Sequence, residues 1–562
     1  MNPTPQDYAS WSNLDLIRRV TDLEARLREQ NARHAISPTP TSFKKKPKKE
    51  PKSFDPSRYH TRFIALKFAY LGGKYNGFEH HTNNTTPLPT IEEELWKALR
   101  KTKLIFPDFK EDQNQNEVCW DGVEYSKCGR TDRGVSAFGQ VVGLKVRSSQ
   151  PKAKVVTSEE QNDGDREVNG AANKQDAEDV DTTEEPVETQ HEKPAWDSIQ
   201  DELPYIQLLN RVLPPDIKIL AWCANPPPDF SARFSCKERR YRYFFTNPAF
   251  TPTPGLPTNT KGDAWLDIEA MRGAAKKLEG LHDFRNMCKV DPSKQLTTFE
   301  RRIFSARIEA VTADQEPGAF LARPPFAADS EQHPASSAEP ELFYFEVCGS
   351  AFLWHQVRHM VAVLFLVGQG YEDPSIVDML LDPSKMPGRP VYEMASDGPL
   401  VLWDCIFPDS DSIARDNHDG ALSPSGYEDA LEWIYVGDDV GGRDTAKRPE
   451  VGIADGKFGR NGIMDDLWAQ WRKRKMDEVL AGSLMDIVAR QPVHSVRLAN
   501  GGGQSRSVDS ARVFDGSECP RAVGRYTPVA KREQLETPEV VNARYAKRKG
   551  LAAVTDTDDH GD

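Results

Sequence analysis

The chain has 562 residues, a formal net charge of -13 at neutral pH and a mean hydropathy of -0.64. Because only 38% of the residues are hydrophobic, we expect one large folded unit with disordered attachments instead of several full-sized packed domains. The chain contains neither a run of 18 apolar residues nor an apolar segment near its start, so we expect neither a membrane-spanning nor a secreted protein.

Residues 1–55 are expected to form a short helix and a basic disordered linker. Apolar residues recur at helical spacing between Leu14 and Leu27, which predicts an amphipathic helix or a fragment of a coiled coil. The basic run Lys44 to Lys49 fits a nuclear import signal, an arm that contacts phosphates or a solvated tether. We therefore expect the protein in the nucleus and the cytoplasm.

Residues 56–150 are expected to form the first half of the main folded unit. An apolar strand is expected from Arg62 to Tyr70, and Thr90 is expected to cap a helix, with Glu93 at the capping-box position. A second strand is expected from Val141 to Val146. The segment just before it, Lys127 to Gln140, is rich in glycine and arginine, so it predicts a tight loop that carries Asp132.

Residues 151–196 are expected to be an acidic disordered insert. Between Thr157 and Ala195, 13 acidic residues face 3 basic ones, a net of -10 that leaves only -3 for the rest of the chain. The segment contains almost no large apolar residues to offset the entropy lost on ordering. The acidity of the chain therefore belongs mostly to the insert and not to the rest of the chain.

Residues 197–409 are expected to form the second half of the main folded unit, with a disordered insert at 322–340. Aromatic residues alternate with polar ones from Arg239 to Phe245, as a strand requires. The remaining expected elements are helices from Tyr205 to Leu213 and from Ile268 to Leu278, a strand from Leu342 to Cys348, and a helix that carries Val357 to Leu364 and ends near Gly368. Residues 410–562 are expected to be a partly disordered C-terminal extension with a helix from Asp465 to Leu480 and a basic segment at 528–550.

The eight cysteines are scattered along the chain, with no Cys-x-x-Cys pair and no cluster with histidine at metal-ligand spacing. This pattern favours reduced thiols and argues against a zinc site. We expect no metal and no cofactor.

Four segments resemble one known family, in its order. The loop Gly129-Arg-Thr-Asp-Arg-Gly-Val-Ser-Ala137 is similar to the signature loop of the TruA-type tRNA pseudouridine synthases, and Phe230 to Phe234, Arg239 to Tyr243 and Ala351 to Arg358 resemble its later motifs. The family usually has Ala and His where this chain has Arg133 and Ser136, a difference that resembles the eukaryotic branch acting at positions 38 and 39 of the tRNA anticodon arm. The resemblance implies an α+β fold of two halves whose antiparallel sheets join into one, with helices on one face and an RNA-binding cleft on the other.

The resemblance also implies a reaction and a set of site residues. Uridine would be isomerised to pseudouridine with Asp132 as the catalytic carboxylate, by attack at C1′, by addition to C6, or by stabilising or deprotonating the sugar. Arg130 is expected to pair with Asp132 and to lower its pKa, and Tyr241 to stack on the flipped base and assist proton removal. Candidates for RNA contact are Arg133, Arg233, Arg358 and Lys127, with Lys237, Arg239, Arg240 and Arg242 as a wider set. Arg358 could bind either a phosphate or the catalytic carboxylate. His355 is expected to be a packing residue outside the catalytic set.

Other functions remain open from the sequence. The chain could act at other positions of tRNA or on mRNA, or it could bind or fold tRNA without catalysis. A hydrolase using Asp132 is disfavoured because no metal-binding carboxylates and no phosphate-binding Gly-Lys-Ser loop accompany it. The expected partner is the anticodon arm of tRNA, with a homodimer possible on resemblance and no membrane association.

Overall fold

The computed structural model describes Arg19 and residues 54–81, 86–110, 114–152, 196–252, 261–262, 264–313, 315, 340–413, 426–438, 456–459, 462–491 and 511–551. The chain divides into two units, Met1–Pro56 and Ser57–Asp562, and all that follows concerns the second. Most of the expected helix from Leu14 to Leu27, the run Lys44 to Lys49, most of the acidic insert and nearly all of the insert at 322–340 lie outside the described residues. Within the described part, no helix is both long enough and apolar enough to cross a membrane.

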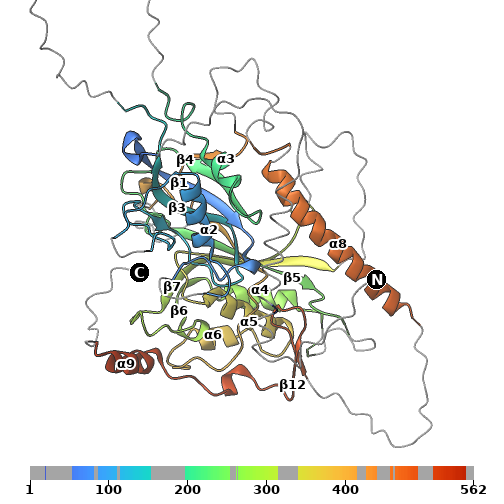
Figure 1. The fold of residues 1–562 in the computed structure, drawn as a ribbon. Helices are drawn as coiled ribbons and strands as arrows, with labels where there is room; N and C mark the ends of the chain where they lie inside the picture. Colours follow the sequence, from blue (N-terminus) through green and yellow to red (C-terminus); the bar gives the residue numbers. More distant parts are fainter. Residues whose placement is uncertain are drawn as a thin grey trace, which may run out of the picture. The chain divides into compact units, whose positions relative to one another are not determined.

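The core of the second unit is one ten-stranded sheet (Figure 1). Its order is β10 (Trp433–Tyr435), β4 (Ile217–Cys223), β1 (Thr61–Tyr70), β3 (Ser136–Arg147), β9 (Leu400–Ile406), β5 (Glu238–Asn247), β8 (Glu341–Gly349), β7 (Glu300–Ala310) and β6 (Gly280–Asp283), while β2 (Ser126–Lys127) also pairs with β3. All neighbours are antiparallel except β3 and β9, where Ser136 pairs in parallel with Val401. The expected fold of two antiparallel halves joined into one sheet is confirmed, and the joint itself is a short parallel pair.

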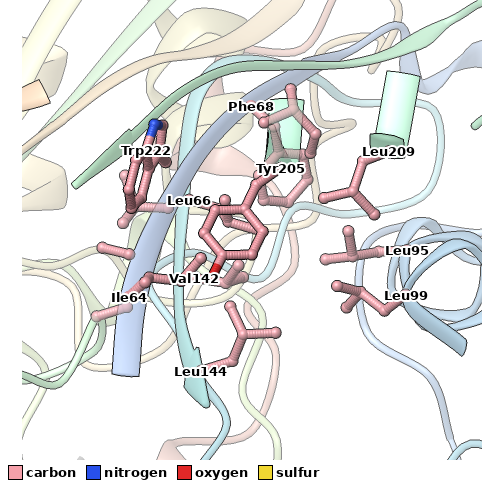
Figure 2. Close-up of a cluster of buried hydrophobic side chains, with 14 of the residues drawn as sticks. Ile64, Leu66, Phe68, Leu95, Leu99, Val142, Leu144, Tyr205, Leu209 and Trp222 are labelled. Atoms are coloured by element: carbon pink, nitrogen blue, oxygen red, sulfur yellow. The ribbon is translucent and has the colours of Figure 1, made fainter. Parts of the chain in front are cut away.

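Helices of the first half cover one face of the sheet. Side chains at every second position of β1, from Ile64 to Phe68, point with those of β3 toward α2 (Ile91–Lys101) and α3 (Tyr205–Asn210), as Figure 2 shows. Side chains alternate between the two faces of a strand, so residues two positions apart lie on the same face. Burying these aliphatic and aromatic side chains supplies the main stabilisation of the half.

Helices of the second half cover the same face of the continuous sheet. Tyr243 and Phe245 of β5 pack edge-on against Phe365 of α5 (Gln356–Gly368), with ring centroids 5.8 and 5.5 Å apart. Tyr241 lies two residues before Tyr243 on β5, so its side chain is on the same face. Its register partner on β9 is Leu402, a core residue of the first half. The helices α4 (Ile268–Lys276) and α6 (Ile376–Leu380) accompany α5.

The remaining elements are short or peripheral. They are the 3-10 turns η2 (Pro56–Arg58), η3 (Gly72–Lys74), η4 (Arg285–Met287) and η7 (Val529–Lys531), the hairpin β11 (Ala511–Val513) and β12 (Arg521–Val523), and the helices α8 (Ile463–Ala489) and α9 (Pro538–Lys549). The expected helix from Asp465 is therefore present but extends to Ala489.

Several local predictions are confirmed at the level of single residues. Thr90 is the N-cap of α2 and its side chain accepts from the amide of Glu93 at 3.2 Å. The expected strands at Arg62, Arg239 and Leu342 and the expected helix ending at Gly368 are also present.

Candidate active site

The loop that carries Asp132 is tied to the helix-bearing face of the sheet by buried hydrogen bonds. The hydroxyl of Tyr70 lies 2.7 Å from Oγ1 of Thr131, and the carbonyl of Thr131 accepts from the amide of Phe78 at 3.0 Å. The side chain of Gln140 accepts from the amide of Gly129 at 2.9 Å and donates to its carbonyl at 3.0 Å. The residues just before Asp132 are therefore fixed by the core, which positions its carboxylate.

A turn after Asp132 requires a glycine. The amide of Val135 bonds to the carbonyl of Asp132 at 3.2 Å, and Gly134 inside this turn has φ of +80°, a conformation costly for residues with a Cβ. A Cβ on Gly134 would also lie 2.2 Å from the carboxylate of Asp397. The expected tight glycine loop is thus confirmed around Asp132, and it brings Asp397 close to Asp132. Its predicted end at Gln140 is wrong, because β3 already begins at Ser136.

The carboxylate of Asp132 is held in a partly buried, polar environment. Its side chain is 24% exposed, and its Oδ2 lies 3.6 Å from Nε2 of His355. Burial raises the pKa of Asp132 to about 6, while the positive charge of Arg358 and a hydrogen bond from the Trp354 side chain oppose the rise and the charge of Asp397 adds to it. At pH 7 roughly nine-tenths of the molecules carry the ionised form, so the group is a usable nucleophile or base.

The expected pairing of Arg130 with Asp132 is wrong. Nε of Arg130 lies 3.3 Å from Oε1 of Glu79, and the side chain is 44% exposed. The arginine whose charge lowers the pKa of Asp132 is Arg358, in the first turn of α5. The pKa of Asp132 is raised and not lowered, because the burial of the carboxylate outweighs the attraction of Arg358.

Lys127 is engaged inside the protein. Its Nζ lies 2.8 Å from Oε1 of Glu92 and 2.9 Å from Oε1 of Glu79, and the side chain is mostly buried. Glu79 therefore links Lys127 to Arg130. We expect Lys127 to brace this network and not to contact phosphate, because its charge is already neutralised by two carboxylates.

Tyr241 lies at the joint of the two halves. It packs against core residues of both and meets Phe352 edge-on, with ring centroids 5.1 Å apart. Burial raises the pKa of its phenol, while the charge of Arg239 lowers it and that of Asp132 raises it, so the hydroxyl is protonated near pH 7. Tyr243, two residues on, is fully buried in the second core. The structure thus brings Tyr241, but not Tyr243, within electrostatic range of Asp132.

His355 is the residue that the sequence reading left out. It is the N-cap of α5 and has φ of +63°, a left-handed conformation uncommon for a residue other than glycine. Burial and the nearby charge of Arg358 lower the pKa of His355 to about 4, so its contact with Asp132 joins a neutral imidazole to a carboxylate near pH 7. Its only sequence signal was membership in the last motif.

The other basic candidates differ in whether a carboxylate already pairs with them. Arg133 is exposed beside Asp132, and Arg358 donates from Nε to the carbonyl of Ala395 at 2.7 Å, which orients its guanidinium. Arg233 lies over Phe234, 5.1 Å from the ring centroid. Arg240 and Arg242 pair with Glu238 and Glu346, both at 2.6 Å, so they are not free charges.

The candidate site lies on the helix-bearing side of the sheet. Asp132 contacts the N-terminus of α5, and Tyr241 shares a strand face with Tyr243, which packs on that helix. The position of the expected RNA-binding cleft stays a prediction. The Asp132 loop lies on this side because Thr131 is hydrogen-bonded to Tyr70, a core residue of β1.

Comparisons with known proteins agree in their descriptions. A family model described as tRNA pseudouridine synthase matches residues 274–408. The chain is 41% identical over 414 residues to the tRNA pseudouridine(38/39) synthase of Saccharomyces cerevisiae, a match that covers 72% of each chain. It is 40% identical to the human protein of that name over 70% of this chain and 66% of the relative, just under two thirds of its length. It is 28% identical to tRNA pseudouridine synthase A of Methanothrix thermoacetophila over 62% of this chain and 84% of the relative.

Proposed function

Since the chain belongs to the TruA-type family of tRNA pseudouridine synthases, we propose that it isomerises uridine to pseudouridine at positions 38 and 39 of the tRNA anticodon arm. The observation that carries the mechanism is the partly buried carboxylate of Asp132, ionised near neutral pH and located where the two halves meet beside Tyr241. Family membership supplies the reaction class, and the relatives' names support the positions.

The reaction breaks the bond from C1′ to N1 of uracil, turns the base and joins C1′ to C5, with no net change in composition. A target base stacked in an RNA arm must first leave its stack. The ring of Tyr241, packed edge-on against Phe352, offers a fixed apolar surface for the extruded base. The Asp132 carboxylate then acts on C1′, on C6 or on the sugar, and the three routes stay open.

Two features keep the carboxylate competent. The charge of Arg358 favours the ionised form, so that burial does not raise the pKa of Asp132 beyond about 6. The neutral imidazole of His355 fills the space beside Oδ2 without adding a counter-charge that would weaken the nucleophile. A proton taken from C5 would pass to the Asp132 carboxylate, either directly or through the hydroxyl of Tyr241, which would accept this proton while giving its own to Asp132.

RNA would be gripped mainly through its phosphates, so affinity should fall as salt rises. Arg133 is the best placed candidate, because it is exposed and directly follows Asp132 in the chain. The family usually has alanine at this position. Arg133→Ala should lower the single-turnover rate or the affinity for tRNA. Full retention of both would remove Arg133 from the site.

The test is single-turnover conversion of an unmodified tRNA, with pseudouridine mapped by carbodiimide-stop sequencing. Wild type should give product at positions 38 and 39, and Asp132→Asn should give none while still binding tRNA. Asp397→Asn is the matched control, because it neutralises the neighbouring carboxylate and should retain product formation. Product elsewhere would keep the family and refute the positions. Tight binding without product in wild type would favour a tRNA-binding or tRNA-folding protein.

We also propose a homodimer located in the nucleus and cytoplasm. The dimer is supported by a row of exposed apolar residues along the C-terminal half of α8: Leu480, Leu484, Met485, Ile487 and Val488. Sedimentation of wild type and of a Leu480→Glu, Leu484→Glu variant would test it, and a wild-type monomer would refute it. Imaging a fluorescent fusion with Lys44 to Lys49 replaced by alanine would test nuclear import, and unchanged import would exclude that run as the signal.

A further inference from the structure

Three buried cysteines from distant parts of the sequence meet beside the candidate active site. The sulfur atoms of Cys128, Cys236 and Cys405 all lie within 4.8 Å of one another. Their residues are 6%, 5% and 0% exposed, and none is in a disulfide. The sequence shows no metal-ligand spacing, because the three cysteines lie far apart along the chain and meet only after folding.

The three cysteines come from the segments that build the site. Cys128 directly follows β2 and precedes Asp132 by four residues, and its amide bonds to the carbonyl of Val141 at 2.9 Å. Cys236 lies in the turn before β5, the strand that carries Tyr241. Cys405 lies on β9, which joins the two halves. A bridge between these sulfurs would thus tie the Asp132 loop to the strand of Tyr241.

The spacing of the sulfurs suits a metal ion. A zinc–sulfur bond of about 2.3 Å places thiolate sulfurs roughly 3.8 to 4.0 Å apart in tetrahedral or trigonal geometry, so the observed cluster needs to contract by at most about 1 Å. Soft thiolate ligands select Zn²⁺ and Cu⁺ over hard cations. No histidine or carboxylate joins the cluster among the described residues, so the ion would have three protein ligands.

The local charge also suits a metal thiolate. Three thiolates and a divalent cation carry a net charge of about -1. Arg239 lies beside the cluster, and its Nη2 donates to the carbonyl of Cys128 at 3.3 Å and to that of Arg233 at 3.1 Å, while Nη1 donates to the carbonyl of Ser350 at 2.7 Å. All three partners are neutral carbonyls, so the guanidinium charge is available to offset a negative cluster.

We propose that Cys128, Cys236 and Cys405 form a three-thiolate site for one thiophilic d10 cation, Zn²⁺ or Cu⁺, which fixes the Asp132 loop against the strand of Tyr241. The site is structural, because its sulfurs are buried and come from the segments that carry Asp132 and Tyr241. It does not depend on which uridine the enzyme modifies.

The test is the metal content of the full chain, purified without chelator after growth with added zinc or copper and measured by plasma mass spectrometry. Wild type should hold about one equivalent per chain, and the element found distinguishes Zn²⁺ from Cu⁺. Cys236→Ser should lower the content at least about tenfold, whereas Cys348→Ser, at a buried cysteine outside the cluster, should not. Circular dichroism of each variant verifies that it is folded.

A second measurement uses wild type alone, in case Cys236→Ser does not fold. Metal-free chain should take up Co²⁺ or Cu⁺ with a thiolate charge-transfer band, and hydrogen exchange of the Asp132 loop should slow when the metal returns. Wild type that carries neither metal and takes up neither Co²⁺ nor Cu⁺ would overturn the proposal. Metal that remains in both Cys236→Ser and Cys405→Ser would also overturn it, because other residues would then hold the ion.

Discussion

The assignment of Arg358 as the charge that keeps Asp132 ionised can be tested through the pH dependence of catalysis. Burial raises the pKa of Asp132 to about 6 even with Arg358 beside it, so the acid limb of the rate profile should have its midpoint near pH 6. The rate should rise with pH, because the ionised carboxylate is the active form. In Arg358→Met the opposing positive charge is lost, so the midpoint should move to higher pH.

The size of the shift follows from the charge that is removed. An opposite charge within a few ångströms typically moves a carboxylate pKa by about 1 to 3 units, and one unit corresponds to about 1.4 kcal/mol. For the smallest of these shifts, the ionised fraction at pH 6 falls from roughly one half to one tenth, a loss of about fivefold. At pH 8 the same shift changes the ionised fraction by only about a tenth.

The assay is a single-turnover series at constant ionic strength, with enzyme in excess over tRNA and each rate normalised to its value at high pH. Normalisation removes any uniform loss caused by a lost phosphate contact. Arg130→Met is the matched control: it removes a neighbouring arginine that pairs with Glu79, so its midpoint should stay near pH 6. A shifted midpoint in Arg130→Met together with an unshifted one in Arg358→Met would refute the reasoning.

Three further predictions concern the same region. Asp132→Asn should stabilise the folded chain at pH 7 by roughly 2 to 3 kcal/mol. The folded-state pKa of about 6 exceeds the ordinary value of 3.8, so the wild-type chain loses stability as the pH rises from about 3.8 to about 6, and the variant does not. Urea unfolding at pH 7 and pH 4 checks it, and a gain of equal size at pH 4 would contradict it. Tyr241→Phe should keep tRNA affinity but lower the single-turnover rate by about a hundredfold if the hydroxyl moves a proton. An unchanged rate would mean that the ring acts only as a stacking surface. Gly72→Ala should cost more than about 2 kcal/mol and most of the activity, because its Cβ would lie 2.1 Å from the backbone oxygen of Val135, whereas Gly73→Ala, with no atom within 4 Å, should be neutral in both assays.

Local patterns sufficed for most of the elements. The N-cap at Thr90, the alternation from Arg239 to Phe245 and the apolar stripe of α5 each depend on residues a few positions apart, and the structure confirms all three. The carboxylate of Glu93, expected to complete a capping box, pairs with Lys97. The strand β9 had no such prediction, although it joins the two halves. Its importance comes from its neighbours in the sheet, which no local pattern specifies.

The sequence by itself determined the family, the reaction class and the presence of Asp132 in a glycine-rich loop, because motifs and turn chemistry are written in consecutive residues. Only the tertiary structure decided that Arg358 and not Arg130 acts on Asp132, that His355 contacts the carboxylate, and that the pKa of Asp132 is raised. It also decided that Cys128, Cys236 and Cys405 meet. Burial and charge-to-charge distances between segments far apart in the chain exist only once the two halves have joined into one sheet.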